Sequence, residues 1–116
     1  MSYIDGFVAC APSGNREAYR AFAEKAAVLF KEFGAVRIVE CWGDDVPEGK
    51  VTDFRRAVQA KEGETVIFSW VEWPDKATRD AGQQKMMTDE RFQNMGDMPF
   101  DGPTMIYGGF TPIMDE

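Results

Sequence analysis

The segment at residues 65–73, Thr-Val-Ile-Phe-Ser-Trp-Val-Glu-Trp, constrains the fold more than any other part of the chain. It is rich in β-branched and aromatic residues and nearly every position is apolar, which predicts a β-strand. A half-solvated antiparallel strand alternates apolar with polar residues, whereas a strand buried on both faces is almost continuously apolar. A chain of 116 residues can cover one sheet face with its own helices, but it has too little material for the other. We therefore expect a second copy of the chain to cover the second face.

The composition indicates a single domain, residues 1–116, long enough to form a hydrophobic core. Asp and Glu outnumber Lys and Arg by 20 to 13, which gives a net charge of −7. Binding to nucleic acid or to anionic lipid depends on Lys and Arg. We therefore expect no nucleic-acid partner and no membrane partner.

The beginning of the sequence lacks the basic and apolar stretches of a signal peptide, and no apolar run approaches the roughly 20 residues that span a bilayer. Cys10 and Cys41 have no close spacing, which fits reduced thiols better than a disulfide framework. We expect a cytoplasmic protein.

The chain contains no histidine. This excludes Ser-His-Asp and Cys-His nucleophile systems, His-ligated zinc and proximal-His haem. Any acid–base chemistry must use carboxylates, Tyr, Lys or Cys. We expect no metal site and no cofactor.

The hydrophobic pattern predicts elements in the order βαββαβ. The predicted strands are residues 3–11, 35–42, 65–73 and 104–110. The first predicted helix is capped by Ser13 or Asn15 and ends near residue 33. The second begins at residues 74–75 and ends near residue 87, with an extra turn at residues 89–92. Residues 53–60 fit a helical turn capped by Thr52 and an edge strand equally well. The order is that of a ferredoxin-like α+β fold with an antiparallel four-stranded sheet, in which the first strand lies between the third and fourth and the second is at an edge.

Four stretches carry a resemblance to a known family: residues 3–7 (YIDGF), 37–54 (RIVECWGDDVPEGKVTDF), 98–102 (MPFDG) and 105–110 (MIYGGF). Together they resemble the YbaA-like family of small bacterial proteins of unknown function, over essentially the whole chain. The resemblance implies a dimeric α+β barrel, in which two ferredoxin-like sheets pack face to face. The wider superfamily includes cofactor-free monooxygenases, haem-degrading enzymes and small-molecule binders. Its haem-using members depend on histidine, which this chain lacks.

Three carboxylates, Asp5, Glu40 and Glu72, lie inside apolar strands. A buried carboxylate has a raised pKa and can act as a general base. The alternative for each is a structural or solvated role, since ion pairs also shift pKa values. We expect Asp5 and Glu72 to lie on adjacent strands.

Aromatic residues and one arginine complete the candidate site. Trp42, Trp70 and Tyr107 are candidates for lining a pocket for a planar apolar ligand, with core or dimer interface as the alternative. Arg37 is a candidate clamp for a carboxylate or phosphate, with plain surface charge as the alternative. The loop at residues 43–50 is not a phosphate-binding loop, because five residues instead of four separate its glycines.

Two functional hypotheses follow. In the first, a homodimer binds or transforms a small apolar or aromatic metabolite in a pocket between sheet and helices. Asp5, Glu72 and Tyr107 supply its polar contacts, Trp70 its packing, and Arg37, Glu40 and Trp42 further ligand contacts. In the second, the protein is a non-catalytic dimeric scaffold or accessory protein. An open pocket with converging polar groups favours the first hypothesis, and an interior filled by aromatic side chains favours the second.

Overall fold

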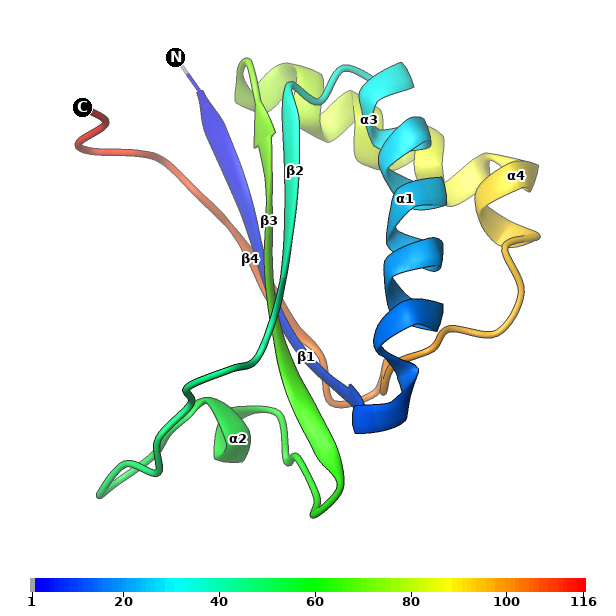
Figure 1. The fold of residues 1–116 in the computed structure, drawn as a ribbon. Helices are drawn as coiled ribbons and strands as arrows, with labels where there is room; N and C mark the ends of the chain where they lie inside the picture. The colour runs from blue at the N-terminus through cyan, green and yellow to red at the C-terminus, as the bar shows by residue number, and fades with distance from the viewer. Residues whose placement is uncertain (1) are drawn as a thin grey trace.

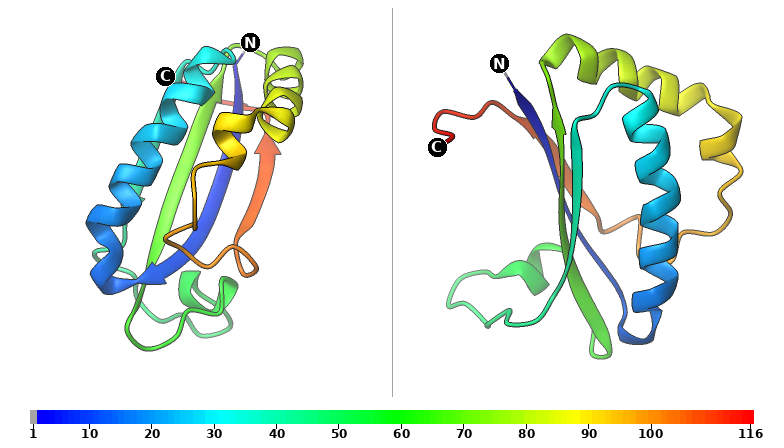
Figure 2. Two further views of the ribbon diagram at one scale, coloured as in Figure 1. Left: turned by 90° about the vertical axis from the view of Figure 1, so that its right-hand side faces the viewer. Right: turned by 45° about the horizontal axis from the view of Figure 1, so that its top comes forward.

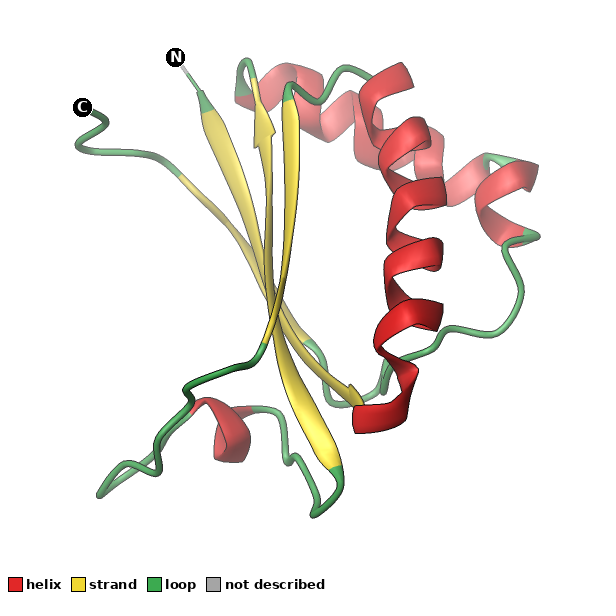
Figure 3. Cartoon of the chain, viewed as in Figure 1, coloured by secondary structure: helices red, strands yellow, loops and turns green. Residues whose placement is uncertain are grey.

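Four antiparallel strands form one sheet, and the long helices lie together on one of its faces (Figures 1 and 3). The computed structural model describes residues 2–116. The strands are β1 (Tyr3–Pro12), β2 (Arg37–Trp42), β3 (Glu64–Trp73) and β4 (Ile106–Phe110). Their order across the sheet is β2-β3-β1-β4, and every neighbouring pair is antiparallel. The predicted α+β topology, with β1 between β3 and β4 and β2 at an edge, is confirmed.

The helices divide between the two faces of the sheet. They are α1 (Arg16–Glu32), α2 (Phe54–Ala57), α3 (Lys76–Thr88) and α4 (Glu90–Gln93), and a 3₁₀ turn (Ser13–Asn15) precedes α1. Figure 2 shows α1 and α3 side by side over one face, with α4 continuing from α3. The short α2 lies across the sheet from them, at one end of the opposite face (Figure 1). No helix within residues 2–116 is long and apolar enough to cross a membrane.

Helix ends differ from the sequence expectations in two places. The ambiguous segment 53–60 begins with helix α2, and Asp53 caps it, because its Oδ1 accepts the Arg56 N–H at 2.7 Å. The expected Thr52 cap is therefore wrong. Neither expected cap residue of α1 caps it with its side chain: Ser13 bonds to the Thr65 hydroxyl at 2.8 Å, and Asn15 donates to the Pro99 carbonyl at 3.4 Å. The preceding 3₁₀ turn leads directly into the helix instead.

Trp73 is the centre of the core beneath the helices. Its side chain is fully buried, and the Phe30 ring of α1 packs against it edge to face, with ring centroids 6.2 Å apart. Helix α3 approaches so closely at Gly82 that a Cβ there would lie 2.7 Å from Cη2 of Trp73 and 3.2 Å from the Phe33 carbonyl oxygen. Only glycine allows this helix-to-sheet distance.

The opposite face of the sheet is covered at one end only. There, Val58, which follows α2, packs on Cys10 and Val66 and all three are buried. The rest of this surface, which we call the outer face, is apolar and partly exposed: Ile4, Val8, Phe68, Trp70, Ile106 and Phe110. The strand register places these side chains together, since Ile4 pairs with Phe110 and Val8 with both Phe68 and Ile106. The chain's own helices therefore cover one face of the sheet and leave most of the other bare.

We expect Gly82→Ala to destabilise the fold, although alanine is the better helix former. Overpacking against Trp73 costs about 1–3 kcal/mol, which exceeds the gain in helix propensity of about 1 kcal/mol. Urea unfolding measures the change in the free energy of unfolding. Gly14→Ala is the matched control, because nothing lies within 4 Å of a Cβ at that position. An equal or raised stability of Gly82→Ala would contradict the close packing described here.

Candidate functional site

The structure does not gather the candidate residues into one pocket. Asp5 pairs with Val71 in the β1–β3 register, while Glu72 pairs with Ile4. Because successive side chains of a strand point to opposite faces, Asp5 lies beneath the helices and Glu72 lies on the outer face. The two carboxylates are on adjacent strands, as expected, but they do not converge.

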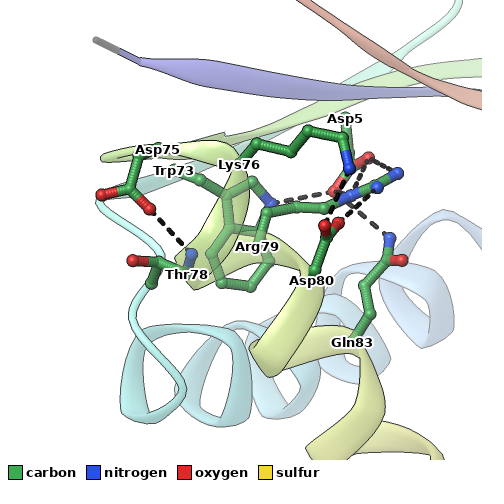
Figure 4. A network of polar contacts seen from close by, with 8 residues as sticks. All are labelled: Asp5, Trp73, Asp75, Lys76, Thr78, Arg79, Asp80 and Gln83. Carbon is green, nitrogen blue, oxygen red and sulfur yellow. Dashed lines mark hydrogen bonds and ion pairs between the residues drawn. The ribbon is translucent and has the colours of Figure 1, made fainter.

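Asp5 is held in a network of hydrogen bonds that joins β1 to α3 (Figure 4). Arg79 donates to both of its oxygens, from Nη2 to Oδ1 at 2.8 Å and from Nε to Oδ2 at 3.2 Å. Trp73 Nε1 donates to Oδ2 at 2.9 Å, and Gln83 Nε2 contacts the same oxygen at 3.4 Å. The Arg79 guanidinium also lies over the Tyr3 ring, 5.1 Å from its centroid.

This geometry favours a structural role for Asp5. The residue is 3% exposed, and both of its oxygens already accept hydrogen bonds. The hydrogen bonds with Asp5 raise the pKa of Arg79, so the guanidinium keeps its charge. A general base needs access to a substrate proton, and here the carboxylate is directed at the side chains that fasten α3 to the sheet.

We expect Asp5→Asn to lower the free energy of unfolding by about 3 kcal/mol, because it removes the buried partner of the largely buried Arg79 charge. Chemical denaturation measures this change. Asp80→Asn is the control, since Asp80 contacts the same guanidinium at 3.0 Å from an exposed position. That variant should change stability little. Equal small effects of the two variants would show that Asp5 does not anchor α3.

A cavity of ≈ 340 Å³ lies between α1 and β2. We call it the α1–β2 pocket, and its lining comprises Arg16, Tyr19, Arg20, Ala23, Glu24, Ala27, Ile38, Glu40, Cys41 and Trp42. Two of the candidate residues, Glu40 and Trp42, therefore meet in a pocket between sheet and helix. Both point to the helix side of β2, because Glu40 pairs with Ser69 and Trp42 with Ile67 of the helix-side set.

Tyr19 connects the two walls of the α1–β2 pocket. Its hydroxyl donates to Oε1 of Glu40 at 2.6 Å, and its ring lies 6.3 Å from that of Trp42. On its other side, the Phe100 ring of the 98–102 segment packs edge to face against Tyr19 at 5.8 Å. One aromatic side chain thus links the helix, the edge strand and the long loop before β4.

The directions in which the pKa values of Tyr19 and Glu40 shift indicate which of the two donates the hydrogen bond. Burial strongly raises the pKa of Tyr19, and the neighbouring Glu40 charge raises it further. Burial also raises the pKa of Glu40, while hydrogen bonds with Tyr19 and Ser69 lower it. Tyr19 is therefore a neutral donor at physiological pH, and Glu40 is the acceptor.

The arginines at the α1–β2 pocket differ in their availability. Arg20 is occupied by Glu17 and Glu24 on its own helix. Arg16 also lines the pocket, and its side chain makes no hydrogen bond or ion pair with any of residues 2–116. Sequence analysis missed both Arg16 and Tyr19. The signal for Tyr19 was a hydroxyl on the apolar side of a helix, which requires a partner once buried.

The remaining candidates lie on or beside the outer face. Trp70 Nε1 donates to Oε2 of Glu72 at 2.9 Å, and Arg37 Nη1 lies 3.6 Å from the same oxygen. Trp70 and Tyr107 both border a wide apolar hollow of ≈ 620 Å³ on this surface. Tyr107 stacks on Phe7, with ring centroids 6.4 Å apart, and is 71% exposed. Its hydroxyl therefore needs no partner from the protein.

One further cluster contains potential metal ligands. The Cys10 sulfur and carboxylate oxygens of Glu64 and Asp101 lie within 4.8 Å of one another. A thiol binds a metal as the thiolate, but burial and both neighbouring carboxylates raise the pKa of Cys10. Cys10 Sγ also contacts the Val58 carbonyl and the Thr104 hydroxyl, at 3.7 and 3.8 Å. This cluster therefore fits a buried structural thiol better than a metal centre.

Comparison with known sequences gives matches over the whole chain. Residues 2–102 match the family described as "Protein of unknown function (DUF1428)". The chain is 62% identical over 117 residues to the uncharacterized protein YbaA of Escherichia coli K12, covering 100% of each sequence. The YbaA protein of Shigella flexneri matches with the same identity and coverage.

Two solved structures show the same fold at low sequence identity. A dimeric ferredoxin-like protein from an uncultured marine organism superimposes with a TM-score of 0.59 at 11% identity, over 100% of each chain. A dimeric ferredoxin-like protein of unknown function from Jannaschia sp. CCS1 gives a TM-score of 0.57 at 14% identity, over 95% of this chain and 99% of that one. At these identities the likeness concerns the fold alone.

Proposed function

The chain belongs to the DUF1428 family of proteins of unknown function, and from this premise we propose that it is a cytoplasmic homodimer that binds a small aromatic ligand. The proposed binding site is the α1–β2 pocket of each subunit. The observation that carries the proposal is the convergence of Tyr19, Glu40 and Trp42 on one cavity.

The chemistry of the α1–β2 pocket supports a planar, partly polar ligand. Its volume of ≈ 340 Å³ lies within the range of about 300–1,000 Å³ of small-molecule sites. Trp42 and Tyr19 present aromatic surfaces, Glu40 accepts hydrogen bonds, and Arg16 supplies a free cation. A ring with a hydroxyl group directed at Glu40 and a carboxylate directed at Arg16 would satisfy all of these groups, and hydroxybenzoates have this chemistry.

We expect 4-hydroxybenzoate to bind saturably and to shift the backbone amide signals of Tyr19, Glu40 and Trp42 in an NMR titration. Glu40→Gln and Arg16→Gln should each weaken binding about tenfold or more, because each removes a charge-assisted hydrogen bond. Glu32→Gln, at the far end of α1 and paired with Arg91, is the control that should bind normally.

Two outcomes would contradict this site. One is signal shifts confined to the outer face, around Trp70 and Phe110. The other is a binding constant that is unchanged in both pocket variants. Cyclohexanecarboxylate, which has neither an aromatic ring nor a hydroxyl group, serves as the matched ligand that should bind weakly.

The bare outer face supports the homodimer. Contiguous exposed apolar patches on a protein mark interaction sites, and a two-fold axis would bury this patch against its own copy. Both structural relatives named above are described as dimeric. Reduced thiols accord with the cytoplasm, since Cys10 and Cys41 are both free and lie on strands that are not neighbours.

Sedimentation should show the wild type as a dimer at micromolar concentration and Phe68→Lys as a folded monomer. Phe68 is 44% exposed on the outer face, so the substitution leaves the core intact but places two like charges near the symmetry axis. Val28→Lys, on an exposed position of α1, is the control that should remain dimeric. A well-folded wild-type monomer would overturn the proposed assembly.

The scaffold hypothesis has one observation in its favour. The polar groups of the interior are mutually satisfied: Asp5 is occupied by Arg79, and the hydroxyl of Tyr19 already bonds to Glu40. These polar groups therefore need no ligand to complete their hydrogen bonds, as the scaffold hypothesis requires. The titration decides between the two functions, since a scaffold predicts no saturable binding in the α1–β2 pocket.

A further inference from the structure

The C-terminal segment, residues 111–116, leaves the body of the subunit on the side of the outer face (Figure 1). It follows β4 without forming a helix or strand, and its Ile113 and Met114 side chains are 99% and 74% exposed. We propose that this C-terminal segment docks on a second copy of the chain, against the start of β2, where Arg37 binds its acidic end. The inference rests on the proposed homodimer and adds a specific contact to it.

The strand register places the two docking elements at the same level of the sheet. Arg37 pairs with Glu72, Glu72 with Ile4, and Ile4 with Phe110. These four residues form one row across the sheet, which begins with Arg37 on one edge and ends with Phe110 on the other. The C-terminal segment therefore leaves the sheet at the level of Arg37, but from the opposite edge.

Two-fold symmetry brings these opposite edges together. When two sheets pack face to face about an axis parallel to the strands, the β4 edge of each copy lies opposite the β2 edge of the other, at the same level. The C-terminal segment of one copy then starts beside Arg37 of the second copy.

The side chains at the start of β2 match those of the C-terminal segment. Arg37 is 64% exposed and its nearest carboxylate, Glu72, lies 3.6 Å away and already accepts a bond from Trp70, so the guanidinium retains free donors. The side-chain carboxylates of Asp115 and Glu116 provide acceptors for it.

Apolar surface is available for the remainder of the segment. Val36, directly before β2, is 61% exposed, and Val39 is partly exposed on the outer side of the strand. These positions supply contacts for Ile113 and Met114. The sequence made Arg37 a candidate clamp for a carboxylate or phosphate, with plain surface charge as the alternative. In this inference Arg37 binds the side-chain carboxylates of Asp115 and Glu116 of a second copy.

Sedimentation equilibrium of point variants and of one truncated variant tests the charge contact. Arg37→Glu and a truncation after Thr111 should each raise the dimer dissociation constant about tenfold or more. Arg37→Glu combined with Asp115→Lys and Glu116→Lys should restore it to within about threefold of wild type, because the swapped charges attract again. Lys25→Glu, an equal charge reversal on α1, is the control without effect.

Disulfide trapping tests the position directly. In a Cys41→Ser background, Ile113→Cys with Val36→Cys should form a covalent dimer on oxidation, whereas Ile113→Cys with Val28→Cys on α1 should not. The docking of the C-terminal segment is overturned if the truncated protein dimerises as tightly as the wild type and the Ile113→Cys, Val36→Cys variant gives no covalent dimer. That result leaves the homodimer intact. A wild-type monomer overturns both.

Discussion

The central constraint on this molecule is that β3 has large apolar side chains on both of its faces. Val71 and Trp73 point into the core beneath α1 and α3, while Phe68 and Trp70 point to the outer face. The long helices α1 and α3 form a layer on one face only, so they bury only the first set. The hydrophobic effect acts equally on both faces. Folding of a single copy therefore leaves the second set partly exposed, and the proposed homodimer would bury it.

The polar contacts beneath the helices follow from the same requirement. An isolated carboxylate on the covered face of β1 would be costly to bury, and Asp5 is tolerated there because Arg79, Trp73 and Gln83 saturate it. In return, the ion pair fixes where α3 crosses the sheet, next to the close contact of Gly82 with Trp73. Charge and packing thus specify the same helix position.

The sequence predicted the elements well because their hydrophobic periods are clear, and it predicted the strand order through the βαββαβ pattern. It did not predict which candidates meet. A one-residue shift in register moves a strand's side chains to the other face, so the separation of Asp5 from Glu72 could not be read from one strand at a time. The partner of Tyr19 was equally hidden, because Glu40 lies on another element, 21 residues away. Thr52 was the expected cap of α2, and the helix instead begins one residue later, so that Asp53 caps it.

The edge strand β2 takes part in both proposed functions, ligand binding in the α1–β2 pocket and dimerisation. Alternate residues of this strand serve opposite surfaces: Glu40 and Trp42 face the α1–β2 pocket, while Arg37 and Val39 face the outer side. An edge strand is bonded to the sheet along one side only, so β2 is the part of the pocket wall with the fewest constraints. A second copy that binds Arg37 and covers Val39 would hold this wall from outside. Association would then fix the distance between Glu40 and Tyr19, and ligand affinity in the pocket would be thermodynamically linked to dimerisation.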